Sequence, residues 1–267
     1  MSRAESALRR FQSVIKNNLS PSARRIIGAV IFLLILSLLL VYVFVIRGVG
    51  IKYAKNEDGT SYSVVGMGIN FNSDIEIPEA YKELPVTAIG ENAFSDVLGK
   101  QIKSIKIPDT VTSIGWGAFS KCEKLESVTI PNGVTIIEEM TFDDCKSLKT
   151  VYLGDGVKVI ENAAFRNCPS LEGVVVPRGL TRIGNEAFSY CISLQSIEIP
   201  ASVSYIGEMA FYRCTSLTSA YFENWEFWRV GSDSDRYTSV SNGVLKDPEM
   251  AARLLSDEYS ELTWKYR

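Results

Sequence analysis

Hydrophobic residues recur at a fixed interval of 23 residues through the second half of the chain. Three columns of this pattern each contain a single residue type: phenylalanine, cysteine or leucine. The columns are Phe119, Phe142, Phe165, Phe188 and Phe211; Cys122, Cys145, Cys168, Cys191 and Cys214; and Leu125, Leu148, Leu171, Leu194 and Leu217. Such a period is typical of a solenoid, because one short repeat can bury its apolar face only against its neighbours. We therefore expect a stack of similar coils, with any functional surface on the outside of the stack.

Each repeat contains a short alternating segment. In one copy the apolar residues Val128 and Ile130 flank the polar residue Thr129, and this period of two predicts a strand with one buried face. Pro131 follows and ends the strand, because proline cannot donate to a ladder. The segment 115–119 is too short for a long helix, so we expect a single helical or 3₁₀ turn there.

These elements predict an α/β solenoid of about six coils, which we place at residues 84–221. The segments IPDTVTSIGWGAFSKCEKLESVTIP (107–131) and VPRGLTRIGNEAFSYCISLQSIEIP (176–200) carry the pattern most clearly. They resemble the 23-residue repeats of the BspA-like leucine-rich repeat family, found on bacterial and some protozoan cell surfaces. The resemblance covers roughly residues 50–267. It implies a leucine-rich repeat fold and adhesion to host or neighbouring-cell proteins.

Residues 26–46 form an uncharged apolar run of 21 residues with a single serine. At about 1.5 Å per residue, a helix of this length spans the roughly 30 Å hydrocarbon core of a bilayer. A cleaved signal peptide has a shorter apolar region of about 7–15 residues. Because Arg47 also follows the run directly, we interpret it as an uncleaved signal anchor. Six Lys and Arg residues against one Glu precede the run, so the positive-inside rule places the N-terminus in the cytoplasm.

This topology predicts a single-pass plasma-membrane protein with extracytoplasmic repeats on a bacterial cell surface. The basic tail either lies on the inner leaflet as an amphipathic helix or only sets the topology. Near the other end, Asp247 and Pro248 are typical of an N-cap and first helical residue. The expected segments are the cytoplasmic tail (1–25), the transmembrane anchor (26–46), a short linker with a capping hairpin (47–83), the repeats (84–221) and a C-terminal cap (222–267).

Charge differs between the two sides of the apolar run. Residues 48–267 carry 21 Lys and Arg against 30 Asp and Glu, a net charge of −9, whereas the whole chain has −3. An acidic domain argues against nucleic acid, heparin-like glycans and anionic lipid as its partners. We therefore expect a protein partner for the repeats, and no small-molecule substrate.

The residue types present argue against catalysis. The chain contains no histidine, which excludes mechanisms and metal sites that need imidazole. Adjacent carboxylates such as Glu138 and Glu139 are more typical of a solvated surface than of a catalytic pair. A run of alternating oxygen ligands at residues 70–76 lacks the glycine and the glutamate of a calcium loop. We expect no enzymatic activity, no cofactor and no metal.

The cysteine column allows three interpretations. A zinc site needs four converging ligands, whereas a ladder spreads its sulfur atoms along an axis. A disulfide between adjacent coils is permitted by the Cα separation, but parallel side chains keep their Cβ atoms farther apart than a bridge prefers, and five is an odd number. We favour free cysteines that act as small buried hydrophobic residues.

The outward positions of the strands suggest where a partner binds. One outward column is nearly uniform and small, whereas the next varies and includes aromatic residues, which are typical of interfaces. Cross-strand packing of Tyr152 and Val175 for sheet stability is the alternative explanation. The candidate binding residues are Lys106, Thr129, Tyr152, Val175, Glu198 and Tyr221, followed by Trp225 and Trp228.

Two functions follow from these observations. The first is a membrane-anchored recognition or adhesion protein that binds another protein through the surface of the solenoid. The second is an envelope scaffold or accessory subunit that organises membrane partners on the same cell, which the very short linker favours.

Overall fold

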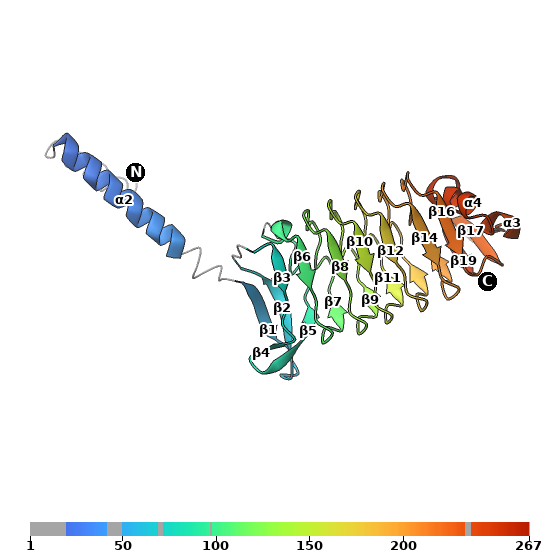
Figure 1. Ribbon diagram of the computed structural model, residues 1–267, viewed down its shortest axis with the longest axis horizontal. Helices are drawn as coiled ribbons and strands as arrows, with labels where there is room; N and C mark the ends of the chain where they lie inside the picture. Colours follow the sequence, from blue (N-terminus) through green and yellow to red (C-terminus); the bar gives the residue numbers. More distant parts are fainter. Residues whose placement is uncertain (1–19, 42–49, 69–71, 97, 233–235, 267) are drawn as a thin grey trace. The chain divides into compact units, whose positions relative to one another are not determined.

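The computed structural model describes residues 20–41, 50–68, 72–96, 98–232 and 236–266. It divides into two compact units, Met1–Val49 and Gly50–Arg267. In the first unit, helix α2 runs over Pro21–Val41 (Figure 1). It begins five residues before the predicted anchor, where Ser20 Oγ accepts a hydrogen bond from the Ala23 N–H at 3.2 Å.

The predicted transmembrane segment is covered only in part. Residues 42–46 of this segment lie outside the described residues, as do residues 1–19 of the predicted cytoplasmic tail. Within the portions of the chain that the structure describes, no helix is both long enough and apolar enough to cross a bilayer.

In the second unit, short strands from successive coils form two rows (Figure 1). The first row, here the first sheet, is the parallel sheet β3-β6-β8-β10-β12, continued by the pair β14-β16. Apart from β12, buried residues alternate with more exposed ones along these strands as predicted: Val151 is buried between Thr150 and Tyr152. The strands are β3 (Asp74–Glu76), β6 (Ser104–Lys106), β8 (Ser127–Thr129), β10 (Thr150–Tyr152), β12 (Gly173–Val175), β14 (Ser196–Ile199) and β16 (Ser219–Phe222).

The second row, here the second sheet, was not predicted. Its repeat strands β9 (Ile136–Ile137), β11 (Val159–Ile160), β13 (Arg182–Ile183) and β15 (Tyr205–Ile206) are parallel and only two residues long. Three antiparallel C-terminal strands extend this sheet in the order β19-β17-β18. They are β19 (Thr263–Tyr266), β17 (Trp228–Ser232) and β18 (Arg236–Ser239). A further strand, β7 (Ser113–Ile114), pairs with β5 (Leu84–Ile89) of the N-terminal sheet.

The predicted helical turn in each coil is wrong. Between the two rows the chain instead makes tight turns with two left-handed residues per coil, such as Met140 (φ 56°) and Asp144 (φ 64°). A left-handed residue interrupts a right-handed helix. Among the described coils, the one helical piece is the 3₁₀ segment η2 (Gly99–Gln101). The fold is therefore a β-solenoid of about seven turns, not an α/β solenoid of about six.

Six phenylalanine rings form a continuous stack through the core. Successive ring centroids lie 5.2–5.3 Å apart and the planes are tilted by 3–10°. All six side chains are at most 1% exposed. The stacked rings are Phe94, Phe119, Phe142, Phe165, Phe188 and Phe211. The coils therefore pack in register, as the identical columns predicted.

The cysteines are free and buried beside this stack. Each thiol donates a hydrogen bond to the phenylalanine carbonyl of the preceding coil, as Cys145 Sγ does to Phe119 O at 3.2 Å. The same carbonyl accepts the N–H of Cys122 at 3.1 Å. The column thus requires a side chain that is small, apolar and able to donate a weak hydrogen bond, which cysteine supplies.

Further elements lie at both ends of the solenoid. The antiparallel hairpin of β1 (Ile51–Lys55) and β2 (Tyr62–Met67) joins β5, with β4 (Ala80–Tyr81) on the other side of β5. At the C-terminal end lie α3 (Asn242–Leu245), α4 (Pro248–Arg253) and a π-helical segment (Leu254–Glu258).

The predicted start of the C-terminal helix is confirmed. The Asp247 carboxylate accepts hydrogen bonds from the N–H groups of Glu249 and Met250 at 3.0 and 3.3 Å. Pro248 occupies the first turn, where its missing N–H is not needed.

Candidate protein-binding surface

Six of the predicted binding residues follow one another along the outer face of the first sheet; we call them the exposed column. Parallel register pairs Thr129 with Tyr152, Tyr152 with Val175, and Glu198 with Tyr221. Paired strands lie about 4.8 Å apart, so neighbouring side chains can contact one partner together. Tyr152, Val175 and Tyr221 are 49%, 54% and 52% exposed. Large side chains this open within a sheet supply apolar area for an interface.

Lys106 begins the exposed column with charge. Its Nζ lies 2.7 Å from Glu76 Oε1 on the neighbouring strand, and Glu76 raises the pKa of Lys106 through this hydrogen bond. Both side chains are more than two thirds exposed, so the pair contributes little to stability. The column is therefore polar at its N-terminal end, and its large exposed side chains, Tyr152, Val175 and Tyr221, come later, with the charged Glu198 between the last two.

A row of small residues runs beside the exposed column. Gly173 is the smallest member, and a Cβ atom placed on it would meet no atom within 4 Å. Packing therefore does not require glycine at this position. The row is Ser104, Ser127, Thr150, Gly173, Ser196 and Ser219. Short side chains therefore stand next to the large exposed ones along the first sheet.

The first sheet is interrupted between β12 and β14. These two strands form no ladder in the described chain and belong to separate sheets. Val174 on β12 is only partly buried, whereas Val151 and Ile197 at the equivalent positions are 0% and 2% exposed. The interruption lies next to Val175, so the most apolar part of the exposed column adjoins a break in the ladder. Nothing in the repeat pattern indicated this feature.

The two tryptophans predicted to continue the column do not belong to it equally. Trp228 is 1% exposed, so its prediction as a contact residue is wrong. It packs against Phe222 and Trp264, and its Nε1 donates to Asn224 O at 2.8 Å. Trp225 is half-buried, and Lys246 Nζ lies 3.9 Å from its ring centroid. The alternation of Trp228 with the apolar Val230 was the sequence signal for an inward orientation.

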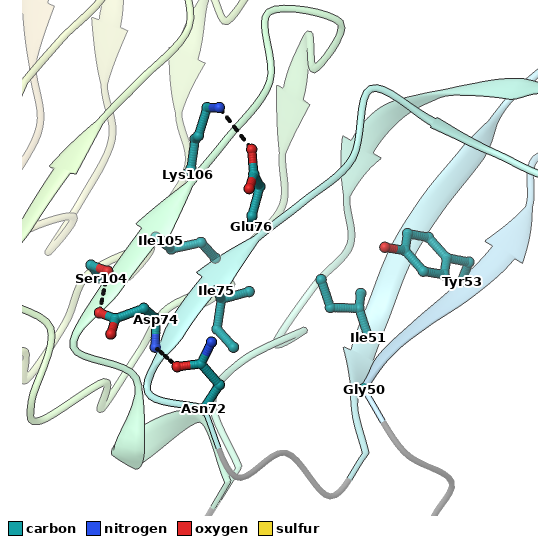
Figure 2. A pocket seen from close by; sticks show the side chains of 10 residues that line it. All are labelled: Gly50, Ile51, Tyr53, Asn72, Asp74, Ile75, Glu76, Ser104, Ile105 and Lys106. Carbon is teal, nitrogen blue, oxygen red and sulfur yellow. Dashed lines mark hydrogen bonds and ion pairs between the residues drawn. The ribbon is translucent and has the colours of Figure 1, made fainter.

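A cavity of about 680 Å³ lies at the N-terminal end of this face, between β1, β3 and β6 (Figure 2). Apolar side chains, including Ile51 and Ile75, line it together with polar ones. Asp74 accepts a hydrogen bond from Ser104 Oγ at 2.6 Å, and its own N–H donates to Asn72 Oδ1 at 3.0 Å. Sequence reasoning missed this cavity, because it depends on where the N-terminal hairpin lies against the first coil.

The cysteine thiols are not poised to act as nucleophiles. Burial raises the pKa of Cys122 and Cys214 to about 12. Burial also raises the pKa of Cys145 and Cys191 well above the usual range. Cys168 is equally buried and donates to Phe142 O at 3.1 Å, which disfavours a thiolate there too. Among the described residues, no group of three or more Cys, Asp and Glu side chains could hold a metal ion.

Comparison with known proteins identifies the repeats. A family model described as the BspA type leucine rich repeat region matches residues 87–218 in six copies. No curated protein matches the sequence.

Several solved bacterial structures are similar. A leucine rich cell surface protein from Faecalibacterium prausnitzii is 27% identical with a TM-score of 0.52, and the match covers 72% of this chain and 57% of that one. A leucine-rich repeat protein of T. pallidum is 29% identical (TM-score 0.46; 64% and 68% covered). One from Bacteroides ovatus is 27% identical (TM-score 0.46; 66% and 64% covered). The chain therefore spans about three fifths to two thirds of the length of these proteins.

Proposed function

Because residues 87–218 of this chain belong to the BspA-type leucine-rich repeat family, we propose that the chain binds another protein through the exposed column of its first sheet. The observation that carries the proposal is the neighbouring pair Tyr152 and Val175, both about half exposed on paired strands. A repeat scaffold has no need of large apolar side chains at outward positions, since its core columns already supply the packing. Tyr221, farther along the same face, offers a second aromatic anchor.

The expected energetics are those of a small number of anchor residues. Side chains at the centre of an interface cost about 2 kcal/mol or more when truncated to alanine. Loss of Tyr152 and Tyr221 together would therefore weaken binding by roughly 4 kcal/mol, or close to a thousandfold. The small row beside the column would let a partner approach the backbone closely, and the break after β12 would offer it strand edges.

A capture experiment tests this proposal. Full-length protein, carrying either Tyr152→Ala and Tyr221→Ala or no substitution, is used to capture partners from the surface fraction of the cells that produce it and from host material. A matched control replaces Tyr190 and Ile136, which are 47% and 36% exposed elsewhere on the coils. We expect capture by the wild type and the control, and loss in the Tyr152/Tyr221 variant. Equal capture by all three proteins would rule out the exposed column.

The same variants separate binding from sheet stability. If Tyr152 serves only to pack across strands against Val175, its truncation lowers the urea midpoint and leaves capture intact. We expect the opposite: a change in stability below about 1 kcal/mol together with loss of capture.

A binding role, rather than a catalytic one, is supported by the residue chemistry. The sequence contains no histidine, and burial raises the pKa of the Cys122 and Cys214 thiols. Both facts leave the chain without an activated nucleophile and base of the usual kinds.

We also propose that residues 26–46 anchor the chain in the plasma membrane, with the repeats outside the cell. Support comes from the 21-residue uncharged run and from the six basic residues before it. Extraction of membranes with alkaline carbonate tests the anchor: a chain that is released into the supernatant is not anchored.

The alternative function, a scaffold for partners on the same cell, is favoured by the short linker. Four residues separate position 46 from the start of β1 at Ile51. Protease added to intact cells distinguishes the two functions. Cleavage of the repeats supports recognition of another cell, whereas complete protection excludes it and leaves the scaffold.

A further inference from the structure

Cations and an aromatic ring gather at the C-terminal end of the second sheet, on its outer face. Register places Arg182 beside Tyr205, Tyr205 beside Lys265, and Lys265 beside Arg229. Four residues distant in sequence thus form one row across β13, β15, β19 and β17, which we call the basic row. Arg182, Lys265 and Arg229 are exposed, and Tyr205 is half-buried.

Aromatic rings hold two of these cations along the sheet. The guanidinium carbon of Arg182 lies 4.9 Å from the ring centroid of Tyr205, and Lys265 Nζ lies 4.5 Å from that of Tyr237. The cation–π contact of Arg182 leaves its charge available to an anion on the open side. Arg182 and Arg229 form no ion pair with any residue that the structure describes.

The sign of this charge is opposite to that of its surroundings. Residues 48–267 carry a net charge of −9. On the same sheet, Glu138 and Glu161 directly follow β9 and β11, whereas Gly184 and Gly207 occupy the equivalent places after β13 and β15. Two carboxylates present beside the earlier strands are thus absent beside β13 and β15, and the outward register position changes from Ile136 and Val159 to Arg182. The net charge of the domain conceals this local group of cations.

The size of the basic row limits its partner. Four strands at about 4.8 Å span roughly 15–20 Å, and a row one side chain wide covers about 200 Å². A stable protein–protein interface takes about 800 Å² from each partner, so this row is too small for a second copy of the chain or another globular domain. A single extended segment matches both its length and its width.

An anionic membrane surface fits less well than such a segment. Charges act over about 8–10 Å at physiological salt. A narrow segment lying on the basic row is within this distance of its three cations, whereas a bilayer also meets the repulsion of the surrounding acidic domain.

We infer that the basic row is a second binding surface, and that it takes an extended acidic polypeptide segment. Carboxylates on one side of an extended chain recur about every 7 Å, a spacing that the long Arg and Lys side chains can follow. This surface lies on the second sheet and is independent of the exposed column on the first.

Binding of a fluorescent poly-glutamate peptide of about ten residues to the full-length protein tests the inference. The probe is titrated at 20 mM salt against wild type and against a variant with Arg182→Glu and Arg229→Glu. The control variant, Lys52→Glu with Lys121→Glu, changes the net charge equally at exposed residues outside the basic row. We expect about tenfold weaker binding for the row variant, at most about a twofold change for the control, and loss of binding at 300 mM salt.

Three results would overturn the inference. The first is a wild-type protein that does not bind the peptide. The second is equal weakening by both variants, which would assign binding to net charge alone. The third is a row variant that binds phosphatidylserine vesicles more weakly than the wild type but binds the peptide equally well. Such a result would make the basic row a membrane contact.

Discussion

The cysteine column makes the stability of the solenoid sensitive to alkaline pH. Burial raises the pKa of Cys122 and Cys214 from 9.0 to about 12. Between these values the folded state keeps both protons while the unfolded state releases them. The contribution of these thiols is therefore complete below pH 9 and is lost as the pH rises toward 12. Above pH 10, the two thiols together steepen the fall of the free energy of unfolding by about 2.7 kcal/mol per pH unit. Between pH 9 and 10.5 they lower this free energy by about 3 kcal/mol, because the unfolded thiols are only half ionised at pH 9.

A loss of this size is a large part of the roughly 5–15 kcal/mol that stabilises a typical domain. Urea unfolding between pH 8 and 10.5 measures it, with the fluorescence of the buried residues Trp228 and Trp264 as the signal. The variant with Cys122→Ala and Cys214→Ala is the control, because its tyrosines titrate as in the wild type. We expect the stability of the wild type to fall more steeply than that of the control above pH 9, with a difference in slope that reaches about 2.7 kcal/mol per unit above pH 10. Equal slopes for the two proteins would refute the assignment of buried, protonated thiols.

Four other substitutions test the packing and the cap of α4. Phe142→Ala removes a fully buried ring between two stacked neighbours. We expect the free energy of unfolding in urea to fall by about 4–6 kcal/mol. A fall of less than about 2 kcal/mol would contradict the stack. Gly184→Ala places a Cβ 2.7 Å from backbone atoms of the preceding coil and should lower the free energy of unfolding by about 1–3 kcal/mol. Gly173→Ala places its Cβ in open space and should leave stability nearly unchanged. Equal melting temperatures for the two variants would contradict this difference. Asp247→Ala removes the N-cap of α4, and calorimetry should show a loss of about 1 kcal/mol, or no loss if the cap is unimportant.

The periodicity of the sequence was sufficient to predict the first sheet and the core. In β8, for example, Val128 is buried between two exposed residues, as the alternation indicated. The second sheet escaped prediction because a strand of two residues, such as Ile136–Ile137, is too short to show any alternation. The left-handed residues also escaped, since Met140 and Glu186 at equivalent turns have no side-chain preference for positive φ. Register between coils stabilises these turns, and a single repeat contains no sign of it.

The candidate surfaces were predictable to different degrees. The exposed column follows from alternation within each strand, so residues such as Tyr152 could be placed on the outer face from the sequence. The position of Trp228 just after the last repeat suggested an exposed side chain, which is wrong. Its strand pairs with β19 near the C-terminus, and the Trp228 side chain faces the core. The basic row was invisible for the same reason. Lys265 and Arg182 are far apart in sequence and come together only because β19 adds to the edge of β15.

Photo-crosslinking in intact cells tests most directly whether the first sheet is the recognition surface. A benzophenone amino acid is introduced at position 152 or 175 in the exposed column, and at position 136 on the second sheet as the control. We predict a discrete protein adduct from positions 152 and 175 and none from position 136. An adduct from position 136 alone, or the same adduct from all three positions, would contradict a partner bound along the first sheet.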